Sequence, residues 1–199
     1  MAHYFDANPQ IKSHKKEIKY SLLGHELSFI SDNGVFSKDA IDEGSSILLE
    51  TLIPLSIRGD VLDLGCGYGV IGLTLAYFNK DLRVICADVN QRAVELCETN
   101  AKKLQLHNRV ECRISDRYGK IEEAFDSIVI NPPIRAGKEI TYSMYLGALD
   151  HLKENGSMFI VIRKAQGAAS ALEYLESIFS SVTVLEKRRG YWIIQAIKN

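Results

Sequence analysis

The expected fold rests on one stretch, Asp60-Val61-Leu62-Asp63-Leu64-Gly65-Cys66-Gly67-Tyr68-Gly69-Val70-Ile71-Gly72. The apolar run Val61 to Leu64 predicts a strand, and the apolar periodicity from Ile71 to Phe78 predicts a helix. Glycines between them permit a sharp turn and let a ligand approach main-chain atoms that a Cβ would obstruct. The stretch therefore predicts a strand, a glycine loop and a helix N-terminus that together bind a nucleotide-like cofactor.

Two acidic residues accompany the glycine loop. Residues Gly67 to Gly72 fit the dinucleotide pattern G-x-G-x-x-G, and Asp88 follows at about the expected twenty residues. Asp63, however, would repel a pyrophosphate, which dinucleotide sites bind with helix N–H groups. A carboxylate at that position suits a ligand with a cationic amino-acid end. The alternative is a tight turn that binds no ligand.

Asp88 ends the strand predicted at 82–87. An acid at a strand end can accept hydrogen bonds from both hydroxyls of a ribose, and its charge favours a 2′-hydroxyl over a 2′-phosphate. The alternative is an N-cap for the helix that begins near Gln91, a role open to Asp88 or to Asn90. We prefer ribose binding because the glycine loop precedes Asp88.

The composition is that of a soluble globular protein, with 46% hydrophobic and 25% charged residues. A length of 199 residues predicts one domain. We expect residues 1–56 to form an N-terminal accessory arm, hairpin and helix, and residues 57–199 to form the cofactor-binding catalytic core. The formal net charge of −1 means that nucleic-acid binding would depend on local basic patches.

The cysteines are scattered and none forms a C-x-x-C pair, so metal-ligand spacing is absent. In a chain without a secretory signal, such cysteines predict buried reduced thiols and a cytoplasmic protein. No apolar run approaches the length that spans a bilayer. We therefore expect neither a metal nor a membrane partner, and the sequence leaves the oligomeric state open. The cysteines are Cys66, Cys86, Cys97 and Cys112.

After the glycine loop, strand and helix patterns alternate, which predicts βαβ crossovers and a parallel sheet. The last two strands, 182–187 and 191–197, are joined by a turn too short for a crossover and must be antiparallel. Ahead of the loop, residues 18–30 predict a β-hairpin and residues 45–55 a helix. The intervening strands are expected at 82–87, 109–114, 125–130 and 157–162, and the helices at 91–106, 141–152 and 168–179.

A second informative stretch is Asp126-Ser127-Ile128-Val129-Ile130-Asn131-Pro132-Pro133-Ile134, an apolar strand that leads into two prolines. The prolines fix φ, remove two N–H donors and hold Asn131 in an extended conformation. Carbonyl groups then project at the carboxyl edge of the sheet, where open α/β sheets bind ligands. We expect this loop and the glycine loop to face one crevice. The alternative is a turn without a function.

These motifs resemble those of class I S-adenosylmethionine-dependent methyltransferases. The D-L-G-C-G-Y-G run is similar to their cofactor loop, and N-P-P-x resembles their motif IV for planar exocyclic or amide nitrogens. The resemblance implies an α/β, Rossmann-like fold with a seven-stranded, mostly parallel sheet, a C-terminal antiparallel hairpin and S-adenosyl-L-methionine as cofactor. It also implies an adenine contact at the Ser115-Asp116 corner, where a surface turn is the alternative. The implied cofactor-binding residues are Asp63, Gly65, Cys66, Gly67, Gly69, Asp88, Val89, Ser115, Asp116 and Asn131.

The expected chemistry explains the Asn-Pro-Pro motif. An exocyclic amine conjugated to a base is a poor nucleophile because its lone pair is delocalised, so it needs positioning more than deprotonation. If the Asn131 side-chain oxygen and the Pro132 carbonyl accept its two N–H groups, the lone pair is aimed at the sulfonium methyl group. Catalysis by Asn131 and Pro132 is then mainly orientation and electrostatics.

Further motifs resemble the small methyltransferase domain family of ribosomal RNA guanine-N2 methyltransferases. They are His3-Tyr4-Phe5 with Asn8-Pro9, Gly34-Val35-Phe36-Ser37 with Asp42 and Gly44 after it, and Gly137-Lys138. The resemblance implies that the segment containing Phe36 helps to wall the active site. The resemblance implies methyl transfer to the exocyclic N2 of a guanine in small-subunit ribosomal RNA, with the RNA or the small ribosomal subunit as partner. Family members often carry an additional domain that this chain lacks.

The chain departs from the family at Ile134, because the position after the prolines is often an aromatic residue that stacks on the target base. Phe36 or Tyr191 is the candidate replacement. The expected substrate-binding residues are Phe36, Pro133, Ile134, Arg135 and Lys138.

Basic residues are expected to form a phosphate-binding rim around the crevice. Arg188 and Arg189, in the C-terminal hairpin turn, are expected at the opposite end of the sheet. The rim comprises Arg135, Lys138, Arg163 and Lys164, with Lys12, Lys15 and Lys16 from the N-terminal arm.

Three alternatives remain. A methyltransferase for protein glutamine or DNA adenine would share the N-P-P loop, although Ile134 weighs against protein glutamine. Asp63, the N-P-P loop and the terminal hairpin count against a nicotinamide-dependent oxidoreductase. A non-catalytic RNA-binding relic of the fold predicts a damaged cofactor loop, and this loop is intact.

Overall fold

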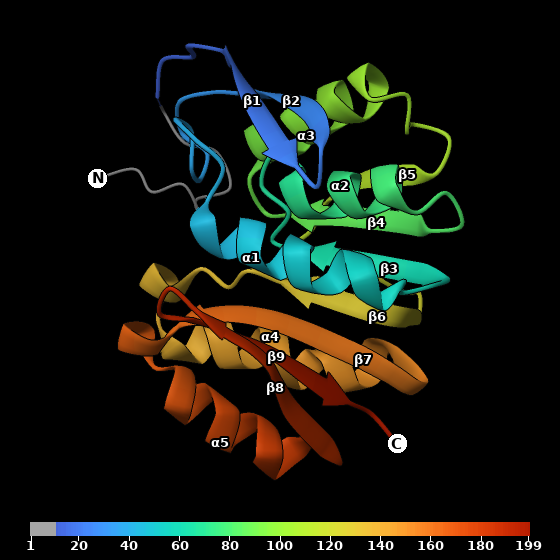
Figure 1. The fold of residues 1–199 in the computed structure, drawn as a ribbon, viewed down its shortest axis with the longest axis vertical. Coiled ribbons are helices and arrows are strands. Elements are labelled where there is room, and N and C mark those ends of the chain that lie inside the picture. The colour runs from blue at the N-terminus through green and yellow to red at the C-terminus, as the bar shows by residue number, and fades with distance from the viewer. Residues whose placement is uncertain (1–10) are drawn as a thin grey trace.

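The computed structural model describes residues 11–199, which form a seven-stranded sheet and a separate two-stranded hairpin (Figure 1). The resemblance noted at 3–5 and 8–9 lies outside the described residues. The sheet order is β5-β4-β3-β6-β7-β9-β8. Its strands are β3 (Asp60–Leu64), β4 (Arg83–Asp88), β5 (Val110–Ile114), β6 (Phe125–Ile130), β7 (Leu152–Arg163), β8 (Ser181–Arg188) and β9 (Tyr191–Ile197).

The hairpin and helices occupy the positions that the sequence predicts, with shifted ends. The hairpin pairs β1 (Lys16–Leu22) with β2 (His25–Ser31). The helices are α1 (Glu43–Leu52), α2 (Val70–Phe78), α3 (Gln91–Lys103), α4 (Lys138–His151) and α5 (Ala168–Ile178). Short 3-10 turns are η1 (Ile53–Leu55), η2 (Ile134–Ala136) and η3 (Lys164–Gln166).

In the parallel part of the sheet, the strand order reverses at β3. Strands β3, β4 and β5 are added one way, and β6 and β7 are added on the other side of β3, all parallel. Strand β9 then pairs antiparallel with both β7 and β8. This confirms the predicted mostly parallel sheet with a C-terminal hairpin. The loops after β3 and β6 meet at the switch point, where open α/β sheets bind ligands.

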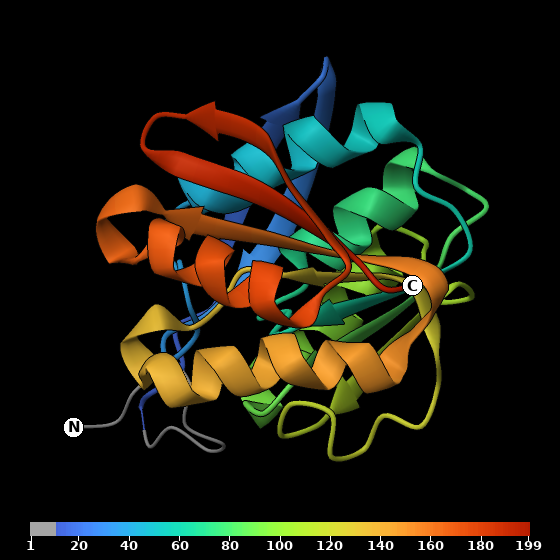
Figure 2. The same ribbon diagram turned by 90° about the horizontal axis from the view of Figure 1, so that it is seen from below.

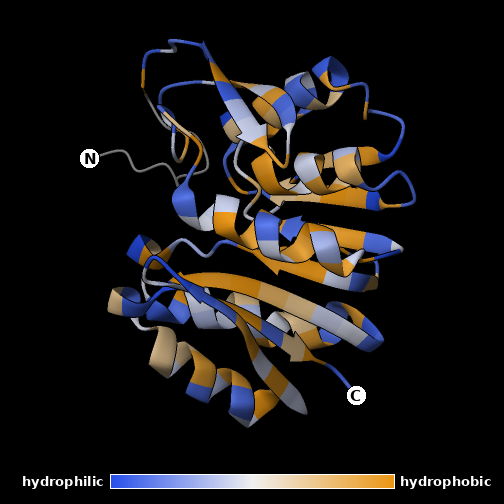
Figure 3. Ribbon diagram, in the orientation of Figure 1, coloured by the Kyte–Doolittle hydropathy of each residue, from blue (hydrophilic) through white to orange (hydrophobic). Residues whose placement is uncertain are grey.

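Both faces of the sheet are covered by helices, with α4 and α5 on one side and α1 and α2 on the other (Figure 2). Alternate residues of each strand therefore enter different cores: Val61 and Val129 face the α1 side, and Leu62 and Ile128 face α4 and α5. The central strands are hydrophobic along most of their length (Figure 3). Such strands are typical of parallel sheets buried on both faces.

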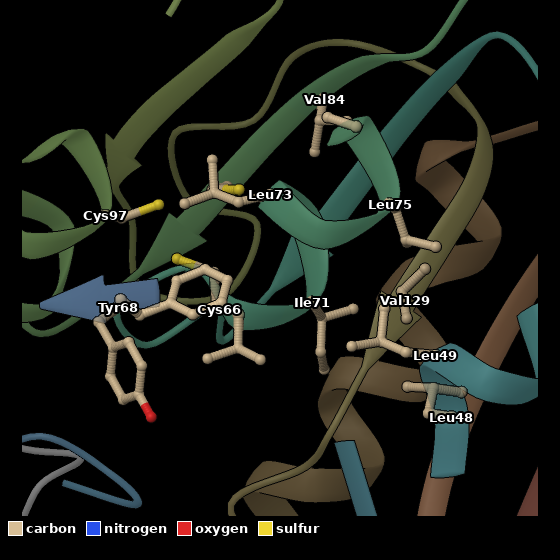
Figure 4. Close-up of a cluster of buried hydrophobic side chains, with 14 of the residues drawn as sticks. Leu48, Leu49, Cys66, Tyr68, Ile71, Leu73, Leu75, Val84, Cys97 and Val129 are labelled. Atoms are coloured by element: carbon tan, nitrogen blue, oxygen red, sulfur yellow. The ribbon is translucent and has the colours of Figure 1, made fainter. Parts of the chain in front are cut away.

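The core beneath α1 and α2 reaches the glycine loop. Ile71, Leu73 and Leu75 of α2 belong to one buried cluster with Leu48 of α1 and with the strand residues Val84 and Val129 (Figure 4). Side chains from the loop itself, Cys66 and Tyr68, belong to the same cluster. Because these side chains are buried in the same core, the loop backbone is held in place relative to the sheet.

The hairpin is tied to this core by Asn100, which is fully buried in α3. Its side chain donates to the carbonyls of Ile30 and Tyr68 at 3.0 and 2.9 Å, and accepts from the N–H of Ile30 at 2.7 Å. One amide thus connects the end of β2 to the glycine loop.

The ends of helix α1 and the start of strand β7 differ from the prediction. Helix α1 begins at Glu43 rather than near position 45, because Asp42 caps it through the N–H of Ser45. The helix ends at Leu52 and is followed by the 3-10 turn η1, which contains Pro54. Strand β7 begins at Leu152 rather than near position 157, immediately after α4. Among the described residues, no helix combines the length and apolarity needed to cross a bilayer.

Candidate functional site

A cavity of about 300 Å³ lies at the carboxyl edge of the sheet, a size within the range of small-molecule sites. The loops that follow β3, β4, β5 and β6 line it, together with the segment that leads into α1. The structure brings these sequence-predicted residues together in its lining: Phe36, Gly65, Cys66, Gly67, Asp88, Val89, Ser115, Asp116, Asn131, Pro132 and Pro133.

The glycine loop presents bare backbone to the cavity. Gly65 and Gly67 have φ of +79° and +56°, which glycine adopts without strain. A Cβ on Gly67 would have no neighbour within 4 Å, and one on Gly65 would meet only the Met144 methyl at 3.7 Å. The space above these main-chain atoms therefore fits the close approach of a cofactor. A Cβ on Gly69 would instead meet Cys97 Sγ at 2.5 Å.

Two predicted cofactor residues, Gly69 and Asp63, do not line the cavity. Asp63 is 1% exposed, and its Oδ2 accepts from the N–H of Gly72 at 2.7 Å. Strand alternation turns this side chain toward α2, beneath the loop. Burial raises the pKa of Asp63 well above its ordinary range. Direct contact of Asp63 with the ligand's cationic end, as the sequence suggested, does not follow from this geometry.

Asp88 lies at the end of β4 and fastens the glycine loop. Its Oδ2 accepts from the N–H of Gly67 at 2.8 Å, and its Oδ1 accepts from the N–H of Asn90 at 2.9 Å. The N-cap of α3 is Asn90, whose side chain accepts from Ala93. Asp88 is therefore not the cap, and it is one of the residues that line the cavity. Burial raises the pKa of Asp88.

The Ser115-Asp116 corner is a hydrogen-bonded turn that also faces the cavity. Ser115 Oγ donates to the carbonyl of Arg117 at 2.8 Å and accepts from the N–H of Lys120 at 3.0 Å. The Asp116 carboxylate is exposed and pairs with Arg117 Nε at 3.0 Å. The corner thus combines the two alternatives that the sequence left open, a turn and an acceptor at the cavity.

The Asn-Pro-Pro loop lies across the cavity from the glycine loop. Pro133, with φ −75° and ψ 76°, forms an inverse γ-turn in which the Pro132 carbonyl accepts from the N–H of Ile134 at 2.8 Å. A carbonyl has two lone pairs, so one remains for a ligand. The Asn131 Nδ2 atom donates to Asp42 Oδ2 at 3.0 Å and to Ser45 Oγ at 2.9 Å.

Phe36 is the exposed aromatic residue among those that line the cavity, whereas Tyr68 is buried and Ile134 is not in the lining. Ile134 is half-buried and packs against the core on the α4 and α5 side, and its contact with the target base stays a prediction. Phe36 is 39% exposed. Its loop is held by hydrogen bonds from Tyr68 Oη to the carbonyl of Ser37 and from Asn90 Nδ2 to that of Gly34, at 3.1 and 2.9 Å.

The predicted basic residues Arg135 and Lys138 are exposed and outside the cavity lining. They lie in η2 and at the start of α4, directly after the Asn-Pro-Pro loop. Arg163 ends β7 and Lys164 begins η3, at the same edge of the sheet. From the arm, Lys16 forms an ion pair with Asp39.

The expected position of the C-terminal hairpin turn was wrong. Because β9 runs antiparallel to β7, Tyr191 pairs with Arg163, and the turn lies at the carboxyl edge of the parallel strands (Figure 1). Arg163 extends over the Tyr191 ring, with Cζ 4.9 Å from its centre. Arg189 pairs with Glu43 and Arg188 with Glu50.

Ser45 is the most important lining residue that the sequence reasoning missed, whereas Asp42 was named there only as part of the segment expected to wall the active site. The available pattern was an Asx cap, Asp42-Glu43-Gly44-Ser45, which predicts a helix start but not its contact with Asn131. The remaining lining residues are Ser37, Leu64, Tyr68, Val70, Ile71, Ala93, Arg117, Ala136, Ile140 and Met144.

The thiols form no disulfide, and three of them are buried as expected, whereas Cys112 is partly exposed. The sulfur atoms of Cys97 and Cys112 lie 3.2 Å apart. Across residues 11–199, no group of three or more His, Cys, Asp or Glu side chains has an arrangement that could hold a metal ion.

The chain matches the family model described as methyltransferase small domain over residues 26–195. The Bacillus subtilis protein YbxB is 43% identical across 98% of this chain and 98% of its own length. Ribosomal RNA small subunit methyltransferase C of Vibrio cholerae is 33% identical across 98% of this chain and 55% of its own. The chain thus spans about half the length of that enzyme.

A solved structure agrees with these sequence matches. The T. thermophilus 16S rRNA N2 G1207 methyltransferase, in complex with AdoMet and guanosine, superposes with a TM-score of 0.84. The sequences are 27% identical, and the match covers 96% of this chain and 52% of that one.

The sheet order and the two loops at its switch point define a Rossmann-like methyltransferase. The chain belongs to the methyltransferase small domain family. It is an S-adenosylmethionine-dependent methyltransferase, which confirms the enzyme class and the cofactor predicted from the sequence.

Proposed function

We propose that this enzyme methylates the exocyclic N2 of a guanine in small-subunit ribosomal RNA. The supporting observation is that Asn131 and Pro132 line one cavity with the glycine loop. The similar enzymes named as ribosomal RNA methyltransferases, and the guanosine in the T. thermophilus complex, support this substrate. The cytoplasm, where ribosomal RNA is made in bacteria, is the proposed location.

S-adenosylmethionine supplies an electrophilic methyl group. We propose that its ribose is bound by Asp88, its adenine by Asp116, and its main body by the bare backbone of Gly65 and Gly67. This places the cofactor between the β3 loop and the Asn-Pro-Pro loop, in the cavity whose lining is largely apolar apart from these groups.

The target amine is held rather than deprotonated. We propose that Asn131 Oδ1 and the remaining lone pair of the Pro132 carbonyl accept its two N–H groups. Both acceptors are fixed, Pro132 by its ring and the γ-turn, and Asn131 by Asp42 and Ser45. Their dipoles stabilise the positive charge that develops on nitrogen as it attacks the methyl group.

Phe36 is the proposed platform for the target base. It is an exposed aromatic ring in the cavity lining, on a loop anchored to Tyr68 and Asn90. Stacking on an aromatic ring contributes about 1–3 kcal/mol per base. Extruding a base from a structured RNA costs a few kcal/mol, so stacking offsets part of that cost.

The direct test is methyl transfer from labelled S-adenosylmethionine to separate pools of ribosomal RNA, small ribosomal subunits, DNA and total protein. We expect the label in RNA, released as N2-methylguanosine on nucleoside analysis. Label only in DNA or protein would replace the proposed substrate. Cofactor binding without transfer to any pool would favour a non-catalytic RNA-binding protein.

Arg163 and Lys164 are proposed to contact RNA phosphates beside the crevice. Replacing both with Ala should weaken RNA binding while leaving S-adenosylmethionine affinity unchanged, because neither lines the cavity. The slope of log affinity against log salt should fall by about one to two, since each lost phosphate contact removes about one released counterion. Lys80 and Lys102 provide a control pair, because both are exposed at the C-terminal ends of α2 and α3, away from the carboxyl edge of the sheet. An unchanged salt slope for the Arg163/Lys164 variant would exclude these contacts.

A further inference from the structure

Asp42 connects the start of α1 to the Asn-Pro-Pro loop. Its Oδ2 atom accepts from the N–H of Ser45 at 2.8 Å and from Asn131 Nδ2 at 3.0 Å. Ser45 Oγ donates to Asp42 Oδ2 at 3.2 Å and accepts from Asn131 Nδ2 at 2.9 Å. The Ser45 side chain is 5% exposed. The cap of α1 and the Asn131 amide therefore belong to one hydrogen-bonded group.

These partners determine how the Asn131 amide is oriented. A carboxylate has only acceptor atoms, so the NH₂ half of the amide must face Asp42. A flipped amide would bring its oxygen against the Asp42 carboxylate. Both Nδ2 protons have acceptors, and within residues 11–199 the Oδ1 atom receives no hydrogen bond from the protein. Oδ1 is thus the unused acceptor of a side chain that lines the cavity.

We propose that Asp42 is a positioning residue for methyl transfer. It acts through Asn131, by keeping Oδ1 available for an N–H group of the substrate amine. This inference rests on the proposed role of Asn131 in the reaction. The hydrogen bonds that Nδ2 donates also polarise the amide, which makes Oδ1 a stronger acceptor.

The surroundings of Asp42 are packed tightly enough to hold it. Gly44 follows it in the first turn of α1. A Cβ at position 44 would lie 2.9 Å from Tyr191 Cε1 and 3.0 Å from Asp42 Oδ2, so only glycine fits without displacement. Tyr191, from the β8–β9 hairpin, thus lies directly against Gly44 in the first turn of α1.

The test begins with two variants that keep a preferred N-cap. Asp42→Ser retains the cap, but its shorter side chain ends before Asn131. We expect kcat to fall about 10²-fold, the effect of a misplaced reacting group, while KM for S-adenosylmethionine changes less than about twofold. Asp42→Asn keeps a side-chain oxygen at the same length and should recover most of kcat. Equal activity in the two variants would contradict the proposal.

A second comparison separates positioning from a structural role. In an Asn131→Ala background, Asp42→Ser should cause no further loss of methyl transfer, because the group through which it acts is absent. Asp42→Ala, which also removes the cap, should lower the melting temperature more than Asp42→Ser at similar activity. Additive losses of activity in the double variant would overturn the inference.

A third measurement does not depend on the substrate. The side-chain amide of Asn131 gives a pair of ¹H–¹⁵N resonances, identified by their disappearance in Asn131→Ala. We expect them to shift in Asp42→Ser and to remain near the wild-type position in the exposed control Asp39→Ser. Unshifted resonances in Asp42→Ser would disprove the contact. A wild-type enzyme that methylates DNA or protein instead of RNA would overturn only the proposed substrate, and the kinetic comparison would then use that substrate.

Discussion

Replacing Asn131 with Ala is expected to abolish most methyl transfer while leaving the cofactor bound. The loss should be about 10²- to 10³-fold in kcat, the usual effect of removing one preorganised dipole from a reacting group. Affinity for S-adenosylmethionine should change only a few fold, because the bare backbone of the glycine loop and Asp88 remain in place. Single-turnover transfer and calorimetric titration of the cofactor measure the two quantities separately.

Two comparisons make the Asn131 experiment specific. Asn108→Ala changes an exposed Asn that precedes β5, at the opposite edge of the sheet, and should leave both quantities unchanged. Asn131→Asp keeps the size of the side chain and an acceptor, but it places a second carboxylate against Asp42 and should also be poorly active. If Asn131→Ala lost cofactor affinity and transfer equally, the assigned role of Asn131 would be wrong.

Replacing Asp88 with Ala is expected to weaken S-adenosylmethionine binding about 10- to 100-fold. Hydrogen bonds to a charged group contribute about 1.5–3 kcal/mol, and the substitution also frees the N–H of Gly67 that shapes the loop. Isothermal titration with S-adenosylmethionine measures the change directly. Asp81→Ala, an exposed residue ahead of β4, is the matched control.

The Asp88 carboxylate also predicts a pH dependence. Burial raises its pKa above the ordinary range of an aspartate. The ionised acceptor is therefore lost at a higher pH than for an exposed carboxyl, and cofactor affinity should decline on acidification from neutral pH. Asp88→Asn, which cannot ionise, should remove this part of the pH profile. An unchanged affinity in Asp88→Ala would place the ribose elsewhere in the cavity.

The sequence by itself determined the fold class and the two loops that define the enzyme. Hydrophobic runs buried on both faces, separated by helical periodicity, leave a parallel sheet as the solution. The residues Gly65 and Gly67 and the prolines after Asn131 determine the local backbone geometry. Such local geometry can be predicted from the residue types alone. The short turn at 188–190 likewise forces antiparallel strands, as the structure confirms.

Which side chains reach the cavity depends on tertiary packing. Asp63 and Gly69 belong to the glycine motif, yet strand alternation and helix packing turn them away from the lining. Ile134 follows the prolines, but it packs partly against the core on the α4 and α5 side and is absent from the cavity lining. Motif membership specifies the backbone, whereas the direction of each side chain depends on the neighbours that pack against it.

Other features of the site depend on contacts between residues far apart in the sequence. The placement of β9 between β7 and β8 brings Tyr191 and the arginine turn to the carboxyl edge, which spacing along the chain cannot indicate. The cap that Asp42 forms is local in the sequence, and only the folded chain brings Asp42 to Asn131, 89 residues away. The cap pattern is local, whereas its second hydrogen bond is created by the packing of α1 over the sheet.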